Sequence, residues 1–201
     1  MCLLLATAVL TLLSTSFAGP LHCEDSVKQL FLKDLNSIKG KWIFISGTTT
    51  HQKYASILQV VNSSWVEFSP TSQNEICIFN QGNMINGTCH YSSANLTFLN
   101  STFTVTHENA TSTGILLHTC PDCLLMSFIT LDNGEMIQSF YILGRAKKLS
   151  ISDLEAFNRQ AKCLGFPEAP FMYDGETEMC PPTQEHATTE NPAKVKDESS
   201  K

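Results

Sequence analysis

The sequence predicts an all-β fold: an eight-stranded up-and-down antiparallel β-barrel with one C-terminal α-helix packed on its outside. Eight apolar-rich segments, several with alternating residues, follow one another through short connections, and no helical pattern separates them. The shortest connection contains Asn133-Gly134, a pair that favours the type I′ turn of a β-hairpin. One amphipathic segment with a helical period then follows the last strand.

The first expected element is a lead-in over residues 22–39, within which residues 26–35 have helical spacing. A polar loop is expected at 48–52, after the first strand. The expected strands cover residues 41–47, 56–68, 74–81, 84–99, 102–107, 113–119, 123–130 and 135–143. A Greek-key sandwich would fit this number of strands too, but the single terminal helix favours a barrel, on whose wall it can pack.

The terminal helix has its own start and stop signals. Ser152 and Glu155 have the pattern of a capping box, and Gly165 is a natural stop. Four residues lie between these signals on one apolar face: Leu154, Phe157, Ala161 and Leu164. The polar face is short and mixed in charge, which disfavours a helix that lies on a membrane surface.

Both ends of the chain differ in composition from its middle. Residues 1–18 are typical of a secretory signal, although no basic residue precedes the apolar run. That run is shorter than the roughly 20 residues of a membrane-spanning helix. We expect a folded domain over 19–180 and a disordered polar tail over 181–201. The protein is therefore expected to be secreted, without insertion into a membrane.

The net charge of −6 argues against binding to nucleic acid or to anionic membranes. Charged residues make up only 16% of the chain, which is low for a bare soluble surface. Five N-glycosylation sequons would supply the missing polarity, at Asn62, Asn86, Asn95, Asn100 and Asn109. An outward Asn62 conflicts with strict alternation in the second strand, and a bulge near Ser63-Ser64 would remove the conflict.

The cysteines are expected to pair in an oxidising compartment. Of eight cysteines, Cys2 lies in the expected signal segment, so the mature chain keeps an odd number and one is left over. Cys120 and Cys123 could form a redox pair, but no helix follows them, so a small structural disulfide is favoured. With His118 they supply three of the four ligands of a structural zinc site, so we expect no metal. We expect no cofactor either.

Two short motifs at the ends of the strand series suggest a family. Gly40-Lys41-Trp42 opens the first strand, and Tyr141 to Arg145 closes the last. A tryptophan at one end of a barrel, covered by an arginine from the last strand, is a cation–π arrangement that seals the core. Together these residues resemble the lipocalin family. The resemblance implies that Trp42 and Arg145 form the barrel seal.

Further motifs are similar to one group of lipocalins, the alpha-1-acid glycoproteins or orosomucoids. The matching segments are Glu67 to Pro70, Cys89-x-Tyr91, Cys163 to Pro167, Met172 to Asp174 and Cys180-Pro181. Fish members of this group include tributyltin-binding and saxitoxin- and tetrodotoxin-binding plasma proteins. The resemblance covers roughly residues 23–181 and implies an extracellular protein of blood plasma.

The resemblance also implies two disulfides, Cys23–Cys163 and Cys89–Cys180. Each closes a loop of about a hundred residues, and in the chain-entropy model each would stabilise the fold by about 4–5 kcal/mol. Cys77, Cys120 and Cys123 depart from this two-bridge scheme. We expect Cys120–Cys123 as a third bridge and Cys77 as a buried strand thiol.

The resemblance further implies a ligand pocket inside the barrel. Its expected residues are Phe44, Tyr54, Leu58, Leu96, Val105, His107, Met126, Phe128, Ser139 and Tyr141. Two pairs agree with this independently, because Met126 and Phe128, like Ser139 and Tyr141, are two apart and share a strand face. Gln81 completes the expected site as a departure from the family. Mammalian orosomucoids carry an acid there, so a preference for cationic ligands is in doubt.

These observations predict a secreted, glycosylated plasma carrier of small hydrophobic or amphipathic molecules, such as drugs, toxins and steroids. We expect a monomer with no catalytic residues, because the chain shows no catalytic constellation that we would assign. Two alternatives remain open. One is an immunomodulatory or acute-phase role exerted by the surface and its glycans. The other is a lipocalin isomerase that depends on Cys77.

Overall fold

The computed structural model describes residues 23–99, 101–107 and 110–182. The expected signal segment, most of the expected tail, Asn100 and Asn109 lie outside these residues. Within them, no helix is long and apolar enough to cross a membrane.

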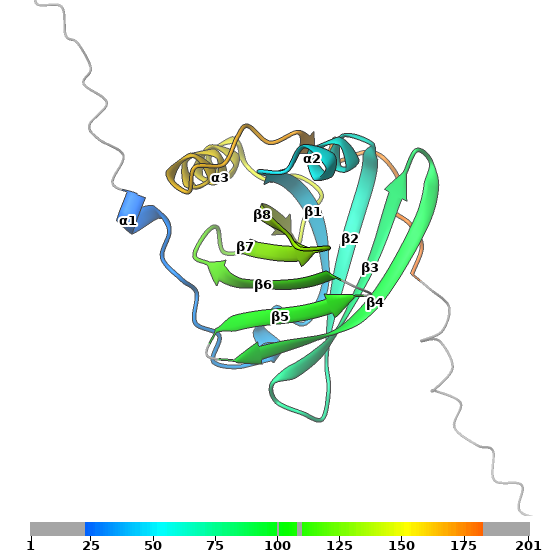
Figure 1. The fold of residues 1–201 in the computed structure, drawn as a ribbon. Helices are drawn as coiled ribbons and strands as arrows, with labels where there is room; N and C mark the ends of the chain where they lie inside the picture. The colour runs from blue at the N-terminus through cyan, green and yellow to red at the C-terminus, as the bar shows by residue number, and fades with distance from the viewer. Residues whose placement is uncertain (1–22, 100, 108–109, 183–201) are drawn as a thin grey trace, which may run out of the picture.

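The described chain forms a closed antiparallel β-barrel of eight strands, which confirms the predicted fold class (Figure 1). Successive strands pair in chain order from β2 to β8, β8 pairs with β1, and β1 pairs back to β2. The strands are β1 (Gly40–Thr49), β2 (Val61–Pro70), β3 (Ile76–Ile85), β4 (Thr88–Leu99), β5 (Thr102–His107), β6 (Ala110–Leu117), β7 (Cys123–Asp132) and β8 (Glu135–Gly144). The short strand β9 (Phe171–Met172) adds to the edge of β1.

Two tight Asn-Gly turns fix the register of their hairpins. Asn133 and Gly134 join β7 to β8, and Asn86 and Gly87 join β3 to β4. All four have positive φ, as a type I′ turn requires. The second turn was missed in the sequence, so β3 runs four residues beyond the expected end at 81.

The largest correction concerns the segment between β1 and β2. A polar loop and the start of a strand were expected there, but residues Gln52–Gln59 form the helix α2. The segment contains helix formers and no glycine or proline, and Tyr54 and Leu58 are spaced to share one helical face. Leu58 is buried in the core. Its burial gives the helix the tertiary contact that a short helix needs.

The lead-in is less helical than expected. Only α1 (Cys23–Ser26) and the 3-10 turn η1 (Leu35–Ile38) are helical, and between them Gln29 forms a bridge with Leu117 at the end of β6. The main-chain N–H of Leu30 also donates to Leu116. The helical spacing at 26–35 therefore does not mark a helix, and Phe31, one of the spaced residues, is exposed.

The terminal helix α3 (Ile151–Cys163) packs outside the barrel, as predicted, but its cap was misplaced. Ser150, not Ser152, is the N-cap, and its Oγ accepts from the N–H of Asp153. Phe157 stacks on Phe140 of β8. Leu164 lies beyond the helix and is exposed, so it is not part of the buried face.

A bulge in β2 settles which way its residues face. The register against β3 shifts between Val61 and Ser63, so Asn62 is the extra residue and is exposed. Its side-chain oxygen accepts from the N–H of Gly87. After the bulge, Ser63 and Trp65 face outward, whereas Val66 belongs to the hydrophobic core. A bulge was expected near Ser63-Ser64, and it lies just before them.

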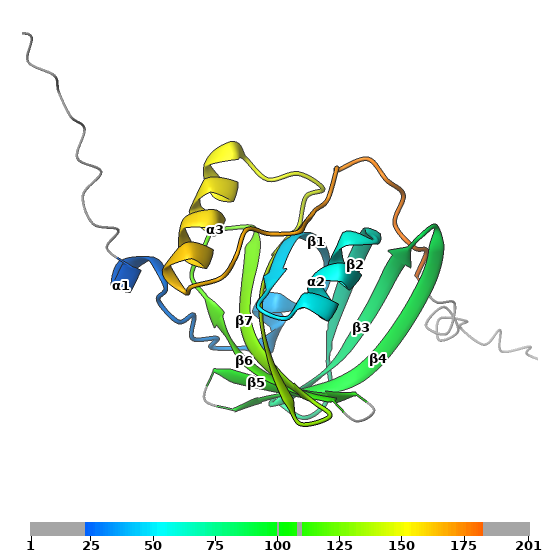
Figure 2. The same ribbon diagram turned by 45° about the horizontal axis from the view of Figure 1, so that its top comes forward.

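β1 is shared between two neighbours. Its first four residues pair with β2, whereas its later residues pair with β8 and, at Ser46 and Gly47, with β9. A register shift between Phe44 and Ser46 accompanies the change of partner. β1 and β2 therefore separate toward one end of the barrel, and α2 connects their separated ends (Figure 2).

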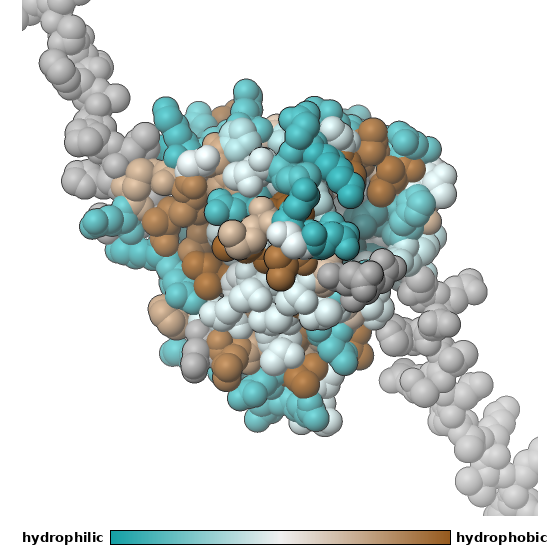
Figure 3. Space-filling model, in the orientation of Figure 1, coloured by the Kyte–Doolittle hydropathy of each residue, from teal (hydrophilic) through white to brown (hydrophobic). Residues whose placement is uncertain are grey.

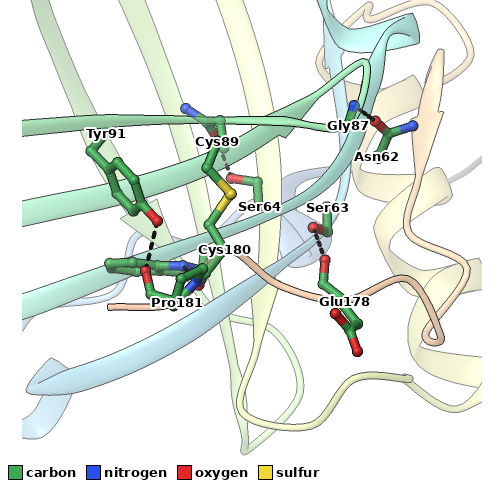
Figure 4. Close-up of a disulfide and its surroundings, with 11 residues drawn as sticks. Asn62, Ser63, Ser64, Gly87, Cys89, Tyr91, Glu178, Cys180 and Pro181 are labelled. Atoms are coloured by element: carbon green, nitrogen blue, oxygen red, sulfur yellow. Dashed lines mark hydrogen bonds between the residues drawn. A yellow bond between two sulfur atoms is a disulfide. The ribbon is translucent and has the colours of Figure 1, made fainter. Parts of the chain in front are cut away.

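The chain after α3 crosses the outside of this gap as a strap, residues 171–181. The N–H of Tyr173 donates to Ile45 on β1, and Trp65 Nε1 donates to the carbonyl of Cys180 beside β2, at 2.8 Å each. The Cys89–Cys180 disulfide then fastens the strap to β4, and the Tyr91 hydroxyl donates to Pro181 (Figure 4).

The other two disulfides join the pairs that were expected. Cys23–Cys163 ties α1 to the end of α3, and Cys120–Cys123 spans the turn between β6 and β7. Cys77 is free and buried. Because Cys120 and Cys123 are bonded to each other, neither supplies a thiolate to a metal at His118.

The end of the barrel where β1 pairs with β2, opposite to α2, is sealed by Trp42 and Arg145. The guanidinium carbon lies 3.6 Å from the ring centroid of Trp42, and the guanidinium donates to the carbonyls of Lys39 and Lys41 at 2.7 and 2.8 Å. Trp42 Nε1 donates to Ile38 in η1. Arg145, the residue directly after β8, therefore holds the lead-in, β1 and the Trp42 ring together.

We predict that Arg145→Met lowers the free energy of unfolding by about 2 kcal/mol, because it removes a cation–π contact and two hydrogen bonds. Urea unfolding followed by tryptophan fluorescence measures the change. Arg159→Met is the matched control: its ion pair with Glu155 spans 3.9 Å on an exposed helix face, so its loss should cost about 0.5 kcal/mol or less. Equal losses for the two variants would contradict the assignment of Arg145 as a seal.

Candidate ligand-binding site

The cross-strand register brings most of the expected pocket residues to the inner face of the barrel. Leu96 lies opposite Val105, Met126 opposite Tyr141, and Phe128 opposite Ser139. Gln81 faces the same side, because it lies opposite Val66, a residue of the hydrophobic core. Tyr54 and Leu58 reach the barrel from α2 instead of from β2.

The interior is packed at the sealed end. Inward side chains there are nearly or fully buried: Val66, Phe68, Cys77, Phe103, Leu116, Leu124 and Leu143. Along β3 the exposure then rises, from Cys77 at 0% to the half-buried Phe79, Gln81 and Asn83. Along β5 it rises from the buried Phe103 through half-buried Val105 to exposed His107.

Inward side chains in a filled barrel would be fully buried. Here several keep accessible surface: Phe79, Gln81, Asn83, Ser92, Ala94, Val105, Phe128 and Tyr141. Inward side chains are therefore buried at one end of the barrel and accessible toward the other end, which we call the mouth. His107 lies at its rim.

Aromatic rings form one wall of this interior. Phe44 packs against Tyr141 with ring centroids 4.8 Å apart and stacks on Phe171 at 4.7 Å, and Phe128 meets Tyr141 edge-on at 5.0 Å. A Cβ at Gly47 would collide with the rings of Phe44 and Tyr141, so glycine permits their close approach. Burial raises the pKa of Tyr141, so its hydroxyl stays neutral.

Neutral polar groups form the facing wall, on β2 and β3. The Ser64 hydroxyl donates to Asn83 Oδ1 at 2.6 Å, and Gln81 Nε2 donates to the same oxygen at 3.1 Å. Two donors on one oxygen fix the orientation of the Asn83 amide. This wall can hydrogen-bond a ligand without carrying a charge.

The helix α2 lies across the mouth (Figure 2). Leu58 is buried beneath it, and the Tyr54 hydroxyl donates to Asp132 Oδ2, at the end of β7, at 2.9 Å. His51, the N-cap of α2, places Nε2 3.1 Å from Glu135 Oε2 at the start of β8. Burial and the Asp132 carboxylate raise the pKa of Tyr54 to about 12, so the hydroxyl keeps its proton.

Several residues of the interior were missed in the sequence. Phe79 and Asn83 lie two residues before and after Gln81, so alternation from Gln81 could have found them. Asp132 lies beside the Asn-Gly turn and could have been placed at the mouth. Phe171 follows α3 by a long connection, and no local pattern places its ring against Phe44.

A separate apolar groove of about 390 Å³ lies outside the barrel, between the end of α3 and the outer faces of β6 and β7. Its lining includes Ile115, Ile129, Leu164 and Phe166. Figure 3 shows apolar side chains gathered on this face beside α3. The groove shares Phe128 with the aromatic wall, but it includes neither the polar wall nor α2.

Three of the sequons fall on described residues. Asn62, Asn86 and Asn95 are all exposed, on or beside β2 and β4. Each side chain is therefore open to solvent.

Cys77 faces the interior at the packed end, opposite Leu96. Burial raises the pKa of its thiol to about 11, so roughly one thiol in a thousand is ionised at pH 8. Because the thiolate is the nucleophile, the residue is poorly suited to attack a substrate.

We predict that Cys77 reacts with iodoacetamide at pH 8 at least 100-fold more slowly in the native protein than in urea. The raised pKa and complete burial both slow the reaction, and unfolding removes both. Mass spectrometry counts the added groups, and the disulfides keep the other described cysteines silent. Rapid alkylation of the folded protein would contradict this environment for Cys77.

Comparison with known proteins agrees with this geometry. No protein-family model matches the chain. Among solved structures, rat epididymal lipocalin 12 superposes with a TM-score of 0.62 at 16% identity, over 77% of this chain and 93% of that one. The siderocalin Ex-FABP gives 0.61 at 9% identity, over 72% and 94%. Both likenesses show that the barrel with its terminal helix has the lipocalin fold.

Two relatives with similar sequences indicate which lipocalins the chain resembles. Alpha-1-acid glycoprotein of Oryctolagus cuniculus is 24% identical over 184 residues, covering 89% of this chain and 90% of that protein. Saxitoxin and tetrodotoxin-binding protein 1 of Takifugu pardalis is 26% identical over 185 residues, covering 81% of this chain and 45% of that protein. The chain thus spans less than half the length of the second relative. The chain therefore has the lipocalin fold and is similar in sequence to alpha-1-acid glycoprotein, as its motifs suggested.

Proposed function

We propose that the protein is a secreted, glycosylated carrier that binds small hydrophobic or amphipathic molecules inside its barrel. The observation that carries the proposal is the interior itself: an aromatic wall faces a neutral amide and hydroxyl wall, and both keep accessible surface toward the mouth. Such a site buries an apolar body and orients it through a few polar groups.

Burial of apolar ligand surface is the main source of affinity in this proposal. Each Å² buried contributes about 25 cal/mol before the costs of association. The rings of Phe44, Phe128 and Tyr141 already touch one another. They therefore need little rearrangement to receive a flat apolar group. A relative of 26% identity is named for binding saxitoxin and tetrodotoxin, which supports small toxins as one ligand class.

Secretion and glycosylation rest on the sequence and on surface positions. The expected signal segment, three disulfides and three exposed sequon asparagines all suit an extracellular protein. The similarity to alpha-1-acid glycoprotein supports a place in blood plasma. We propose that the carrier acts as a monomer.

Binding without turnover is the better account of the interior. The isomerase alternative depends on Cys77, but its thiol is buried and its pKa is raised to about 11. Its cross-strand neighbours are Pro70 and Leu96, and neither can act as a base. A surface role for the glycans remains compatible with the same fold.

We predict that the neutral fluorophore N-phenyl-1-naphthylamine binds saturably and that a steroid, a fatty acid or a basic amine displaces it. Val105→Trp should reduce this binding at least tenfold, because it fills the interior from a half-buried inward position. Thr106→Trp adds the same ring on the exposed outer face and is the control. Unchanged binding in Val105→Trp would exclude the barrel as the site.

We further predict that Gln81→Glu raises the affinity for a cationic amphiphile about fivefold, because it places a carboxylate in the polar wall. The affinity for the neutral fluorophore should change less than twofold. Asn80→Asp puts the same charge on the outer face of β3 and should have no effect, as measured by isothermal titration calorimetry. Equal gains in the two variants would show a general charge effect instead.

A further inference from the structure

The helix α2 is joined to the barrel in two different ways. Its two ends continue into β1 and β2, which lie on one side of the mouth. Its polar contacts reach the turn between β7 and β8 through side chains alone: Tyr54 to Asp132, and His51 to Glu135. Near its last residue, the N–H of Asn86 donates to Val60. The helix is thus hinged on the strands and pinned at the β7–β8 turn.

The position of α2 makes it a cover. Leu58 is buried under the helix, and the Phe44, Tyr141 and Phe171 cluster lies below the same end of β1. Thr49, Ser139 and Ile137 are buried on the β1 and β8 side of the mouth. On the opposite side, Gln81 and Asn83 keep accessible surface. Of the aromatic wall, Phe128 and Tyr141 keep accessible surface, whereas Phe44 is buried. A ligand that packs against Phe44 from the mouth must therefore displace α2.

The contact between Tyr54 and Asp132 is suited to holding a cover that opens. A hydrogen bond to a carboxylate is stronger than one between neutral groups, and this one is half-buried. It has no covalent part, and water can replace either partner once the helix lifts. The His51 and Tyr54 rings meet edge-on at 5.7 Å, so the two contacts share one scaffold.

We propose that Tyr54 and Asp132 form a latch that holds α2 closed and sets the rates of ligand uptake and release. The inference rests on the proposed carrier function. Tyr54 and Asp132 are positioning residues in it: they act on the ligand through the helix. This differs from the sequence-based expectation that Tyr54 is a pocket residue that touches the ligand.

The two roles have different kinetic consequences. A latch that stabilises the closed form of the free and the loaded protein equally slows association and dissociation by the same factor. A ligand contact instead stabilises only the complex, so its loss raises mainly the dissociation rate. The ratio of the two rate changes therefore separates a latch from a contact.

Stopped-flow fluorescence with N-phenyl-1-naphthylamine tests the latch in the full-length mature protein. Tyr54→Phe and Asp132→Asn should each raise both rate constants about five- to tenfold, with the dissociation constant changed less than twofold. The double variant should be no faster than either single one. Tyr91→Phe is the matched control, because it removes a 2.9 Å hydrogen bond from a tyrosine on the outside of the barrel.

A rise in the dissociation rate alone would overturn the proposal in favour of a ligand contact, and rates like those of Tyr91→Phe would overturn it altogether. Hydrogen exchange of residues 52–59 keeps the test independent of the fluorophore. Their amides should exchange faster in Tyr54→Phe than in Tyr91→Phe. If the wild-type protein fails to bind any ligand but this difference is found, the carrier function fails and the latch stands. Equal exchange in the two variants would refute the latch.

Discussion

The division of β1 between two partners governs the rest of the architecture. A closed barrel requires its first strand to pair with both the second and the last. Here β1 pairs with β2 only through Gly40 to Ile43, and it pairs with β8 from Ile43 to Thr49. The barrel is tight where β1 touches both neighbours, which is where Trp42 and Arg145 form the seal. Where β1 leaves β2, unpaired backbone and an opening into the interior both result, and each needs a cover.

Two segments cover that opening, and their chemistry differs. The strap after α3 pairs with β1 through β9, and the Ser63 hydroxyl donates to Glu178. A disulfide then fixes it to β4. The helix α2 has one buried aliphatic side chain and two polar contacts that water can replace. Free energy of opening follows the number and kind of contacts. The strap is thus the permanent cover, and α2 is the segment through which the interior can open.

The sequence predicted the parts of the fold that depend on local and periodic rules. Alternation places Met126 and Phe128 on one face whatever the global fold, and the Asn-Gly pair at 133 and 134 fixes a hairpin. Two of the disulfide pairs, Cys23–Cys163 and Cys89–Cys180, came from the family resemblance, whereas Cys120–Cys123 came from the spacing of the two cysteines. The capping error at α3 was small, because Ser150 and Ser152 offer the same side chain two residues apart, and only the backbone conformation at Ser150 decides between them.

The failures have a different cause. Residues 52–59 have no strong local preference for helix over strand. Val60 and Val61 fit the strand expected at 56–68 as well as Leu58 fits a helix. Only the separation of β1 from β2, a property of the closed sheet, favours the helix there. The bulge at Asn62 likewise depends on where β2 regains its pairing with β3. The ring of Phe171 reaches Phe44 only because β9 joins β1 at Gly47.

The same constraint makes the mouth, rather than the sealed end, the part of the barrel that can accept substitutions. At the sealed end, Phe68, Phe103 and Leu124 are buried against one another, and close packing resists any change of volume. At the mouth, the neutral cluster has Ser64 on the part of β2 that does not pair with β1, and Gln81 and Asn83 on β3. Substitutions there change the polarity of the interior without disturbing the closure of the barrel. In the proposed carrier, ligand preference can therefore change through substitutions at the mouth, such as at Gln81, while the packing of the sealed end keeps the fold.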